Sequence, residues 1–394
     1  MHIREKEIRE KDIREKPMHP SSPVSRPPSS RQKEDPSLAQ TLAVVLSSYL
    51  VFLAALRLFA GSLSLVGGSV GDNPSYLEAA TAIRHWQISG IVVKQFWGLS
   101  YAIAALSAVT GLPGRAALVV VCITASLVSV ILCHRLFGGW IAIFFALLSF
   151  EWFQRSLLGG AEPLFMALIL ASFLALRRAH WAWSAVFGAL ATVVRPFGVF
   201  ALIGTGVQLL RQKKFRQSLL TTAIGLAIGA LYAWPLAHYL GSPFANVAMY
   251  QRNDWHGRPP FILPFLAILR DTFPINAPLT NLALTWAWIL FVLLGLVVAL
   301  RTGAFASYAA DYPAEICFVS LYCLALYTYS APGWARGDFP RFAIPMLPWT
   351  LVFLRRYLPA RRWAVAALTL VSPTLAAASA VGIRNVAEIL SRHR

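Results

Sequence analysis

Charged side chains are scarce in this chain of 394 residues, of which 13% are charged and 57% are hydrophobic. An average soluble domain carries about 25% charged residues. The shortage of charge excludes an ordinary soluble enzyme, and the apolar content excludes a chain that is disordered throughout. The composition instead predicts an all-α, polytopic transmembrane helix bundle that is integral to a membrane and in contact with its lipids.

The chain also lacks the local patterns of nucleotide and zinc chemistry. No Walker A, GxGxxG or HExxH motif occurs in it, so a nucleotide-driven or zinc-dependent enzyme has no support. The four cysteines lie in apolar runs and are expected to pack there without binding metal: Cys122, Cys133, Cys317 and Cys323. We therefore predict no cofactor and no protein metal site, while dependence on a divalent metal stays open.

Negative charge is the scarcer sign, because 35 Lys and Arg stand against 17 Asp and Glu for a net charge of +18. In a soluble protein such an excess indicates nucleic acid. In an apolar chain it is better explained by basic loops on the cytoplasmic side and by anionic lipid or phosphate partners. We expect no nucleic-acid partner.

Residues 1–36 differ in composition from the rest of the chain. The motif IREK recurs at Ile3–Lys6, Ile8–Lys11 and Ile13–Lys16. A five-residue period turns by about 140° per step on a helix, so the isoleucines gather on no single face. Residues 17–36 then carry six prolines. We predict a disordered cytoplasmic tail over 1–36 and one membrane domain over 37–394.

A series of apolar runs follows the tail. A further run at 97–110 is either another span or a half-inserted helix, so the prediction is roughly eleven spans, with a range of ten to twelve. The eleven runs are 41–60, 113–133, 139–150, 163–177, 181–194, 197–210, 218–236, 282–300, 314–329, 342–354 and 363–381.

Basic clusters occur at alternate turns between these runs. They lie at Arg135, Arg177–Arg178, Arg211–Arg216, Arg301 and Arg355–Arg362. The positive-inside rule therefore places these turns in the cytoplasm with the tail. The opposite, outer loops then hold seven of the ten acidic residues that follow the tail: Asp72, Glu78, Glu151, Glu162, Asp254, Asp271 and Asp338. Carboxylates at a membrane edge are costly unless paired or used, so we expect one polar site on the outer face.

The first outer loop offers the candidate catalytic residue. Asp72 lies in Gly71-Asp72-Asn73-Pro74-Ser75, a turn sequence in which an Asp caps the next helix or acts as a base. The two roles do not exclude each other. Residues 76–86 then have the apolar spacing of an amphipathic helix lying in the interface. Tyr76, at its start, is a candidate substrate contact.

Further outer-face residues have one structural and one functional interpretation each. Lys94, Arg195 and Arg341 either anchor lipid headgroups or bind a phosphate. Glu162 either complements the dipole of the helix that it begins or orders a sugar hydroxyl. Gln251 and Trp255 lie in Tyr250–His256, which is either part of an interfacial aromatic belt or a sugar-binding segment.

Taken in order, four segments resemble the GT-C superfamily of integral-membrane glycosyltransferases, which use polyprenyl-phosphate sugars as donors. They are GDNPSYLEAA, FWGLSYAIAALSAVTG, GGAEPLFMALILASFLALRR with GALATVVRPFG, and PRFAIPMLP. GSPFANVAMYQRNDW is similar to a segment of bacterial proteins related to the PIG-V type mannosyltransferase. The chain departs from that type at Gly71, where a Trp is usual, and at Ser242, where an Asp is usual.

The resemblance implies an inverting glycosyltransferase that moves a hexose, with mannose as the candidate, to a hydroxyl of a glycan, lipid or protein acceptor. It places this reaction on the extracytoplasmic face, with the bacterial inner membrane as the expected location. Asp72 would orient or deprotonate the acceptor hydroxyl. Lys94 stands roughly where some members of the superfamily have a phosphate-binding Lys, although Gln95 and Phe96 replace the prolines that follow it there. Lys94, Arg195 and Arg341 would meet the charge of the leaving phosphate.

Other classes of function remain open at the level of sequence. A transporter or a flippase for lipid-linked sugars is the main alternative, although no paired halves with matching broken helices are visible. A polysaccharide polymerase or ligase and a non-catalytic subunit are two more. Convergence of Asp72, Glu162 and Arg341 on one cavity would favour a transferase, whereas a transporter should show polar groups along a path through both leaflets.

Overall fold

The computed structural model describes residues 35–68, 71–88, 95–253, 259–273, 279–330, 338–359 and 361–392, with residues 253, 279–281 and 383–392 described by their backbone alone. These residues belong to one compact unit that begins at Asp35. The predicted tail over 1–36 lies outside the described residues except for its last two positions.

The described chain is all-α, as predicted, with 82% of residues in helices and no strand among the residues described. Each of the eleven predicted apolar runs coincides with a helix or a pair of short helices. The α-helices in chain order are α2 Leu38–Ala60, α3 Asn73–His85, α4 Gly98–Thr110, α5 Gly114–Phe137, α6 Gly139–Leu148, α7 Phe150–Leu157, α8 Glu162–Arg177, α9 Trp181–Val194, α10 Val199–Arg211, α11 Phe215–Leu240, α12 Ala245–Asn253, α13 Leu266–Thr272, α14 Leu279–Arg301, α15 Ala304–Asp311, α16 Pro313–Thr328, α17 Asp338–Ala343, α18 Leu347–Phe353 and α19 Arg362–Arg392. Three 3₁₀ turns join them: η1 Pro196–Gly198, η3 Ile344–Met346 and η4 Arg355–Tyr357.

Five helices of the described chain are long and apolar enough to cross a membrane, namely α2, α5, α11, α14 and α19, and a sixth span results if the bent pair α7 and α8 counts as one. Five further apolar helices, α4, α6, α9, η1 with α10, and α16, have only 10–17 residues. A helix of about 20 residues is needed for a straight crossing. The composition is therefore that of a membrane protein, while the count of roughly eleven spans stays a prediction.

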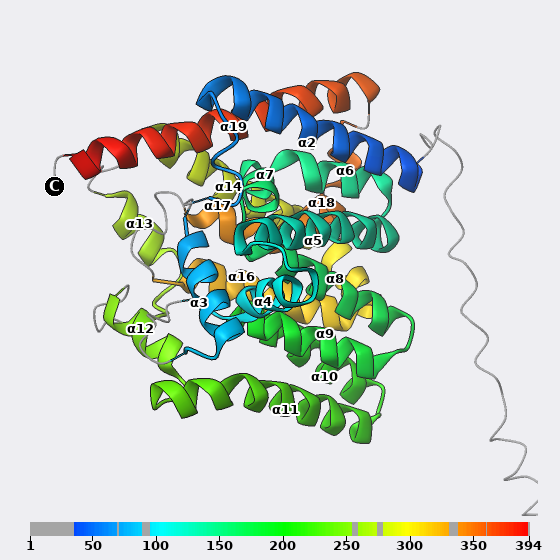
Figure 1. The fold of residues 1–394 in the computed structure, drawn as a ribbon. Helices are drawn as coiled ribbons and strands as arrows, with labels where there is room; N and C mark the ends of the chain where they lie inside the picture. Colours follow the sequence, from blue (N-terminus) through cyan, green and yellow to red (C-terminus); the bar gives the residue numbers. More distant parts are fainter. Residues whose placement is uncertain are drawn as a thin grey trace, which may run out of the picture. The chain divides into compact units, whose positions relative to one another are not determined.

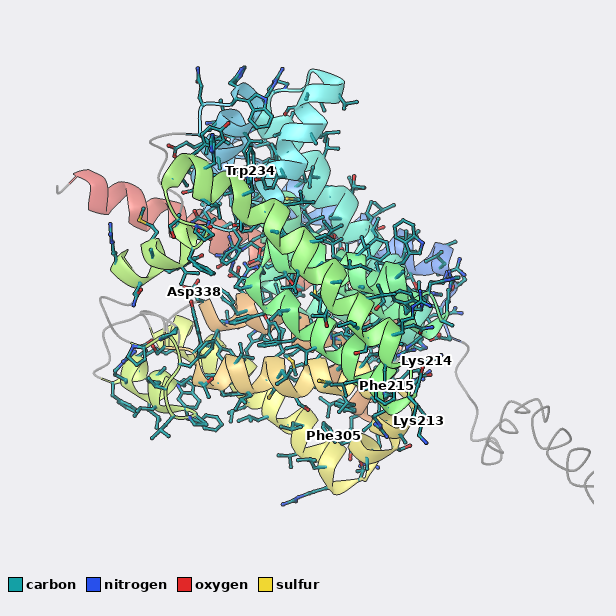
Figure 2. All side chains as sticks on the ribbon, turned by 90° about the horizontal axis from the view of Figure 1, so that it is seen from below. Lys213, Lys214, Phe215, Trp234, Phe305 and Asp338 are labelled. Atoms are coloured by element: carbon teal, nitrogen blue, oxygen red, sulfur yellow. The ribbon has the colours of Figure 1, made fainter. Side chains whose placement is uncertain are left out.

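The helices expose two distinct ends of the bundle (Figure 1). At one end, which we call the basic end, the last residues of α5, α8 and α10 meet the first residues of α11 and α16, through contacts such as Arg177 Nη1 to the Leu136 carbonyl (3.0 Å). Figure 2 shows Lys213 and Lys214 at this end, with Trp234 and Asp338 away from it. The short helices α3, α12, α13 and α17 lie at the opposite end, which we call the Asp72 end.

The helix α3 corresponds to the segment predicted as amphipathic. It buries Tyr76, Ala79 and Ala80 against neighbouring helices and exposes Glu78 and Arg84. Its contacts are with α4 and α5. The helix is therefore two-sided, while its location in a membrane interface stays a prediction.

The basic end is closed by a group that we call the Arg177 cluster, made of Arg177, Tyr308, Glu315 and Trp349. Glu315, only 2% exposed, accepts hydrogen bonds from Arg177 Nε (2.6 Å) and Nη2 (2.9 Å), from the Tyr308 hydroxyl (2.6 Å) and from Trp349 Nε1 (3.0 Å). The Arg177 guanidinium also lies 3.8 Å from the ring centre of Tyr312. The cluster ties α8, α15, α16 and α18 together.

A sharp break between α7 and α8 carries one site residue into the interior. The two helices are bent by 102° across the break. Gly159 has a φ of +119°, and a Cβ there would lie 2.7 Å from Asn73 Nδ2, so only glycine fits. Asn73 Nδ2 donates to the carbonyl of Leu158 (2.9 Å). The break is therefore fastened to the first residue of α3, and Asp72 is held beside the start of α8.

Candidate active site

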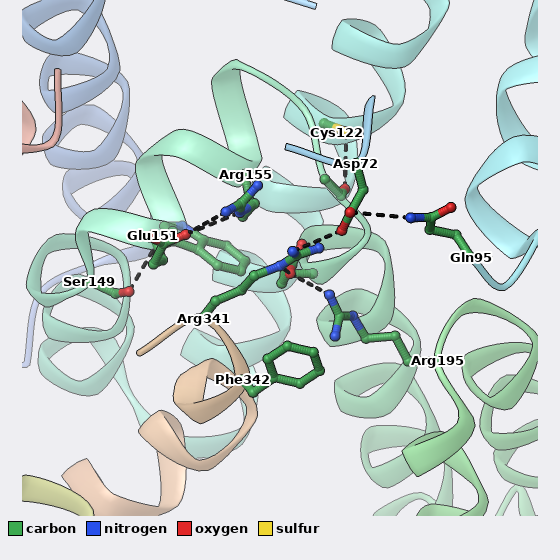
Figure 3. Close-up of polar contacts among 12 residues, drawn as sticks. Asp72, Gln95, Cys122, Ser149, Glu151, Arg155, Arg195, Arg341 and Phe342 are labelled. Carbon is green, nitrogen blue, oxygen red and sulfur yellow. Dashed lines mark hydrogen bonds and ion pairs between the residues drawn. The ribbon is translucent and has the colours of Figure 1, made fainter. Parts of the chain in front are cut away.

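Asp72 directly precedes α3 at the helix N-cap position, but its side chain makes no capping hydrogen bond. Its Oδ2 instead forms an ion pair with Arg341 Nη1 of α17 (2.9 Å), and its Oδ1 accepts from Gln95 Nε2 (3.2 Å). The side chain is 32% exposed. The capping interpretation of Asp72 is therefore wrong for its carboxylate, which is turned toward other charged residues (Figure 3).

Arg341 joins Asp72 to a second carboxylate. Its Nε donates to Glu162 Oε1, and Arg195 Nη2 donates to the same oxygen. Glu162 is the first residue of α8, where the positive end of the helix dipole favours a negative charge. Glu162 is 1% exposed, Arg341 7% and Arg195 9%. We call these four residues, Asp72, Glu162, Arg195 and Arg341, the Asp72 cluster.

Local sequence explains how Arg195 reaches this cluster. Arg195 ends α9 in an extended conformation, with φ −147° and ψ 134°. Pro196 follows and begins the turn η1, and a residue before proline is disfavoured in the helical region. The helix must therefore stop at Arg195. The guanidinium lies 4.6 Å from the ring centre of Phe342, in a cation–π contact that helps to hold it beside Arg341.

The electrostatics of the cluster favour the ionised form of Asp72. Burial is the largest single cause and raises the pKa of the Asp72 carboxyl, but the charge and hydrogen bond of Arg341 and the charge of Arg155 together lower it by more, so the net pKa lies below the ordinary value. Burial lowers the pKa of Arg341, whereas Glu162 and Asp72 raise it by more. The four charges sum to zero, so burial of the cluster is compensated within it.

A cavity of about 300 Å³ opens beside the cluster. Asp72, Arg195 and Arg341 line its polar side, and Tyr76 and aromatic side chains line the rest; the full set is Asp72, Tyr76, Phe96, Val194, Arg195, Pro196, Phe197, Val247, Tyr250, Pro260, Phe261, Tyr329, Arg341 and Phe342. Charged groups beside aromatic rings are the features that bind a phosphate next to a sugar.

Three buried polar atoms of this region have no hydrogen-bond partner among the described residues. They are Glu162 Oε2, Arg195 Nε and Gln95 Oε1. A buried polar atom without a partner is costly. The hydrogen bonds of the Asp72 cluster are therefore incomplete, although these three atoms are covered by protein and do not face the cavity.

A second, larger hollow adjoins the first. It has a volume of about 500 Å³ and shares Phe96 with the cavity beside the Asp72 cluster. Its walls come from α9, α10 and α11, and three glycines, Gly206, Gly225 and Gly229, keep it open. From Ser218 to Tyr232 it follows α11 for about 21 Å, at 1.5 Å per residue. We call it the α11 groove, and none of its lining residues is charged.

The structure places some of the predicted site residues at the cavity and others elsewhere. Asp72, Tyr76, Arg195 and Arg341 line one cavity, and Glu162 lies behind it, bonded to both arginines. Lys94 and Trp255 lie outside the described residues. Gln251 is exposed on α12 and is not among the residues that line the cavity, whereas its neighbour Tyr250 is.

Two contributors have no predicted role. Gln95 bonds to Asp72, and Asn73 holds the site turn to the α7–α8 break. Neither is marked by a motif, since an amide in a turn or loop is ordinary in composition. One signal was available. In the superfamily that the chain resembles, prolines follow the Lys at the place of Lys94, whereas here Gln95 follows and supplies a hydrogen-bonding side chain.

Among the described residues no group of three or more His, Cys, Asp or Glu side chains could hold a metal ion. Asp72 and Glu162 are the two carboxylates of the cluster, and each is paired with arginine. The comparisons with known proteins add no identification. No family model, no curated protein and no solved structure matches this chain.

Proposed function

We propose that this chain is an inverting membrane glycosyltransferase of the GT-C type, which moves a hexose from a polyprenyl-phosphate sugar to an acceptor hydroxyl. The observation that carries the proposal is the convergence of Asp72, Arg195 and Arg341 on one cavity that adjoins an uncharged groove. Such a donor has an anionic centre, a sugar and a long apolar chain. The arginines suit the anionic centre, the aromatic cavity suits the sugar, and the α11 groove suits the apolar chain.

In this reaction the acceptor oxygen forms a bond to the anomeric carbon, and the bond from that carbon to the phosphate oxygen breaks. The acceptor proton passes to the Asp72 carboxylate, and the polyprenyl phosphate leaves with the bonding electron pair. Because the pKa of Asp72 is lowered, the carboxylate is ionised at neutral pH and accepts the proton only as the new bond forms. Attack from the side opposite the phosphate inverts the anomeric configuration.

The arginines would stabilise the leaving phosphate. A guanidinium carries five N–H donors in a planar fork, so pairing with a carboxylate still leaves donors for phosphate oxygens. Arg195 and Arg341 both line the cavity, so their guanidinium groups are placed to supply such donors. Preorganised cations of this kind stabilise a leaving group without a strong acid.

The α11 groove would hold the apolar chain of the donor. It begins at Phe96 and Tyr232, close to the charged cluster, and runs along α11 toward the basic end. A chain laid in it buries apolar surface, which is favourable by about 25 cal/mol per Å². The occupant proposed here is the isoprenoid chain, because the groove joins the phosphate end of the site directly.

The described residues favour this proposal over a transporter. A polar cavity of about 340 Å³ does lie at the basic end, and its lining includes Arg177, Glu315, Lys214 and Asp311. It shares no lining residue with the cavity beside Asp72. Transport would need polar groups along a continuous path, and the described residues form two separate polar ends.

The test uses the purified full-length chain in liposomes with polyprenyl-phosphate hexoses labelled in the sugar, presented with candidate acceptors. We expect labelled sugar bonded to an acceptor, in inverted configuration, and free polyprenyl phosphate in equal amount. Liposomes with the Asp72→Asn chain are the control for spontaneous transfer. Movement of intact donor between leaflets, with no sugar released from it, would contradict the proposal and identify a flippase.

A further inference from the structure

The side chain of Gln95 joins the segment 95–97 to the Asp72 carboxylate by a hydrogen bond. Its Nε2 lies 3.2 Å from Asp72 Oδ1, on the oxygen that Arg341 does not engage. The amide must present its N–H₂ group, because its carbonyl oxygen would be repelled by a carboxylate. Asp72 is thus held by one charged donor and one neutral donor, on different oxygens.

The backbone of Gln95 is itself fixed from α12. Asn246, which is 2% exposed, donates from Nδ2 to the carbonyl of Gln95 at 2.7 Å. Asn246 Oδ1 in turn accepts from the Tyr232 hydroxyl of α11 at 3.1 Å. A continuous series of hydrogen bonds therefore leads from Tyr232 through Asn246 and Gln95 to Asp72.

Ring packing holds the same segment in place. Phe96 stacks on Tyr232, with ring centres 6.0 Å apart and planes 7° from parallel. Trp97 is 1% exposed and belongs to a small hydrophobic cluster with Ala79, Ile88 and Leu236. Because the carbonyl of Gln95 and the two residues after it are held, the amide has little freedom to leave the carboxylate.

We propose that Gln95 is a positioning residue for Asp72 and that Tyr232 and Asn246 hold it in place, so that the junction of α11 and α12 sets the orientation of the carboxylate. The inference rests on the proposed function, in which Asp72 accepts the acceptor proton. Orientation decides whether the free lone pairs of the carboxylate face the acceptor oxygen, and misplacement by about 1 Å can cost about 100-fold in rate.

The first test compares Gln95→Met with wild type in the transfer assay. Methionine has a similar length but cannot donate, so we expect kcat to fall about tenfold with the donor KM changed less than twofold. The acid limb of the pH profile should also move upward by about 0.5–1 pH unit, since a hydrogen bond to the ionised form is lost. The matched control is Gln87→Met, in the same connection but with an exposed side chain.

The second test asks whether Tyr232 acts through Gln95. Tyr232→Phe removes only the hydroxyl and keeps the ring that stacks on Phe96. We expect it to lower kcat about threefold in the wild-type background and to have no further effect in the Gln95→Met background. If the two reductions in kcat multiply in the double variant, Tyr232 does not act on Asp72 through Gln95.

A third measurement separates this inference from the proposed function. The carboxylate band of Asp72 is isolated as the infrared difference between wild type and Asp72→Asn, and it is titrated in each chain. Gln95→Met should raise the midpoint of this titration whether or not any sugar is transferred. An unchanged midpoint together with unchanged kcat would overturn the role of Gln95, whereas absence of transfer with a shifted midpoint would overturn only the proposed function.

Discussion

The Asp72 cluster and the Arg177 cluster are each built around a buried glutamate paired with arginine, and they lie at opposite ends of the bundle. In the Arg177 cluster, Glu315 has both oxygens engaged, by Arg177, Tyr308 and Trp349. In the Asp72 cluster, Glu162 leaves Oε2 without a partner among the described residues, and Arg195 leaves Nε. Both glutamates are almost fully buried, so exposure does not explain the difference.

Each cluster lies beside a cavity, so we base the distinction between a structural ion pair and a candidate binding site on the completeness of the hydrogen bonds. A buried pair whose hydrogen bonds are complete fixes the helices that carry it and has nothing left to offer a ligand. An incomplete one carries an energetic cost that a purely structural role leaves unexplained. We therefore interpret the Arg177 cluster as a structural tie at the basic end, and we propose the Asp72 cluster as the part of the site that meets a charged substrate.

The largest expected effect is on stability, from Glu315→Gln in the Arg177 cluster. It leaves the Arg177 charge without its carboxylate, which costs about 3–5 kcal/mol for a buried pair. We expect a clear loss of thermal stability in detergent, with transfer per folded molecule unchanged. The double variant Arg177→Met with Glu315→Leu should recover much of the loss, because both charges are gone. Wild-type stability of Glu315→Gln would contradict the structural role.

The next effect is on donor use, from Arg341→Ala in the Asp72 cluster. Loss of a charged hydrogen bond to the phosphate should weaken transfer by about 1.5–3 kcal/mol, or about 10- to 150-fold. Arg341→Lys should recover only part of this, since a single ammonium cannot replace the planar fork. The measurement is kcat/KM for the donor. Equal kcat/KM values in wild type and Arg341→Ala would contradict a contact with the donor phosphate and leave Arg341 with only its ion pairs to Asp72 and Glu162.

Fold and site were predictable from the sequence to different extents. The eleven apolar runs coincide with helices because continuous hydrophobicity is a local property that survives tertiary context. Hydrophobicity does not settle the number of spans. The helix α6, for example, has only 10 residues, and the backbone N–H of its first residue, Gly139, donates to the carboxylate of Asp35, which is distant in sequence (2.8 Å). Whether such a helix crosses a bilayer depends on its neighbours.

Within the candidate site, scarcity of charge pointed to four residues that lie together in the fold. Asp72, Glu162, Arg195 and Arg341 were predictable because few carboxylates and arginines occur near the outer turns of an apolar chain. Their partners were not. Asn73 reaches the carbonyl of Leu158 across 85 positions, and Asn246 reaches Gln95 across 151. Such contacts depend on how α3, α8 and α12 come together, which no local pattern encodes.

A smaller effect concerns the pH dependence of transfer. It is expected only from the Asp72 cluster, whose carboxylate Asp72 is partly exposed. The pKa of Asp72 is lowered in the folded chain, so its ionised form adds stability above the unfolded pKa and loses it as pH falls through the folded pKa. Transfer should therefore stay level from neutral pH down to about pH 4, the ordinary range of an Asp. A pH–rate profile checks this. A loss of activity centred near pH 6 would indicate a different base.

The smallest expected effect comes from the α11 groove, through Gly229→Leu. A Cβ at Gly229 meets no atom within 4 Å, so the side chain fits without strain and fills the groove. We expect the donor KM to rise about fivefold, about 1 kcal/mol, for long isoprenoid chains only. Gly382→Leu is the control, since that glycine on α19 also has open space around it. If the KM values for donors with long and short isoprenoid chains are equal in both variants, the α11 groove does not bind the donor.

The most direct test of the central claim is Asp72→Asn in the reconstituted transfer assay, beside Glu78→Gln as the control. Asn keeps the size of the side chain and removes the base, while Glu78 is an exposed carboxylate on α3, the helix that Asp72 precedes. General-base assistance is worth about 10²–10⁴-fold in rate. We predict that Asp72→Asn folds with near-normal thermal stability and loses transfer by that factor, while Glu78→Gln keeps it. Wild-type transfer by a folded Asp72→Asn chain would contradict the assignment of the Asp72 cluster as the catalytic centre.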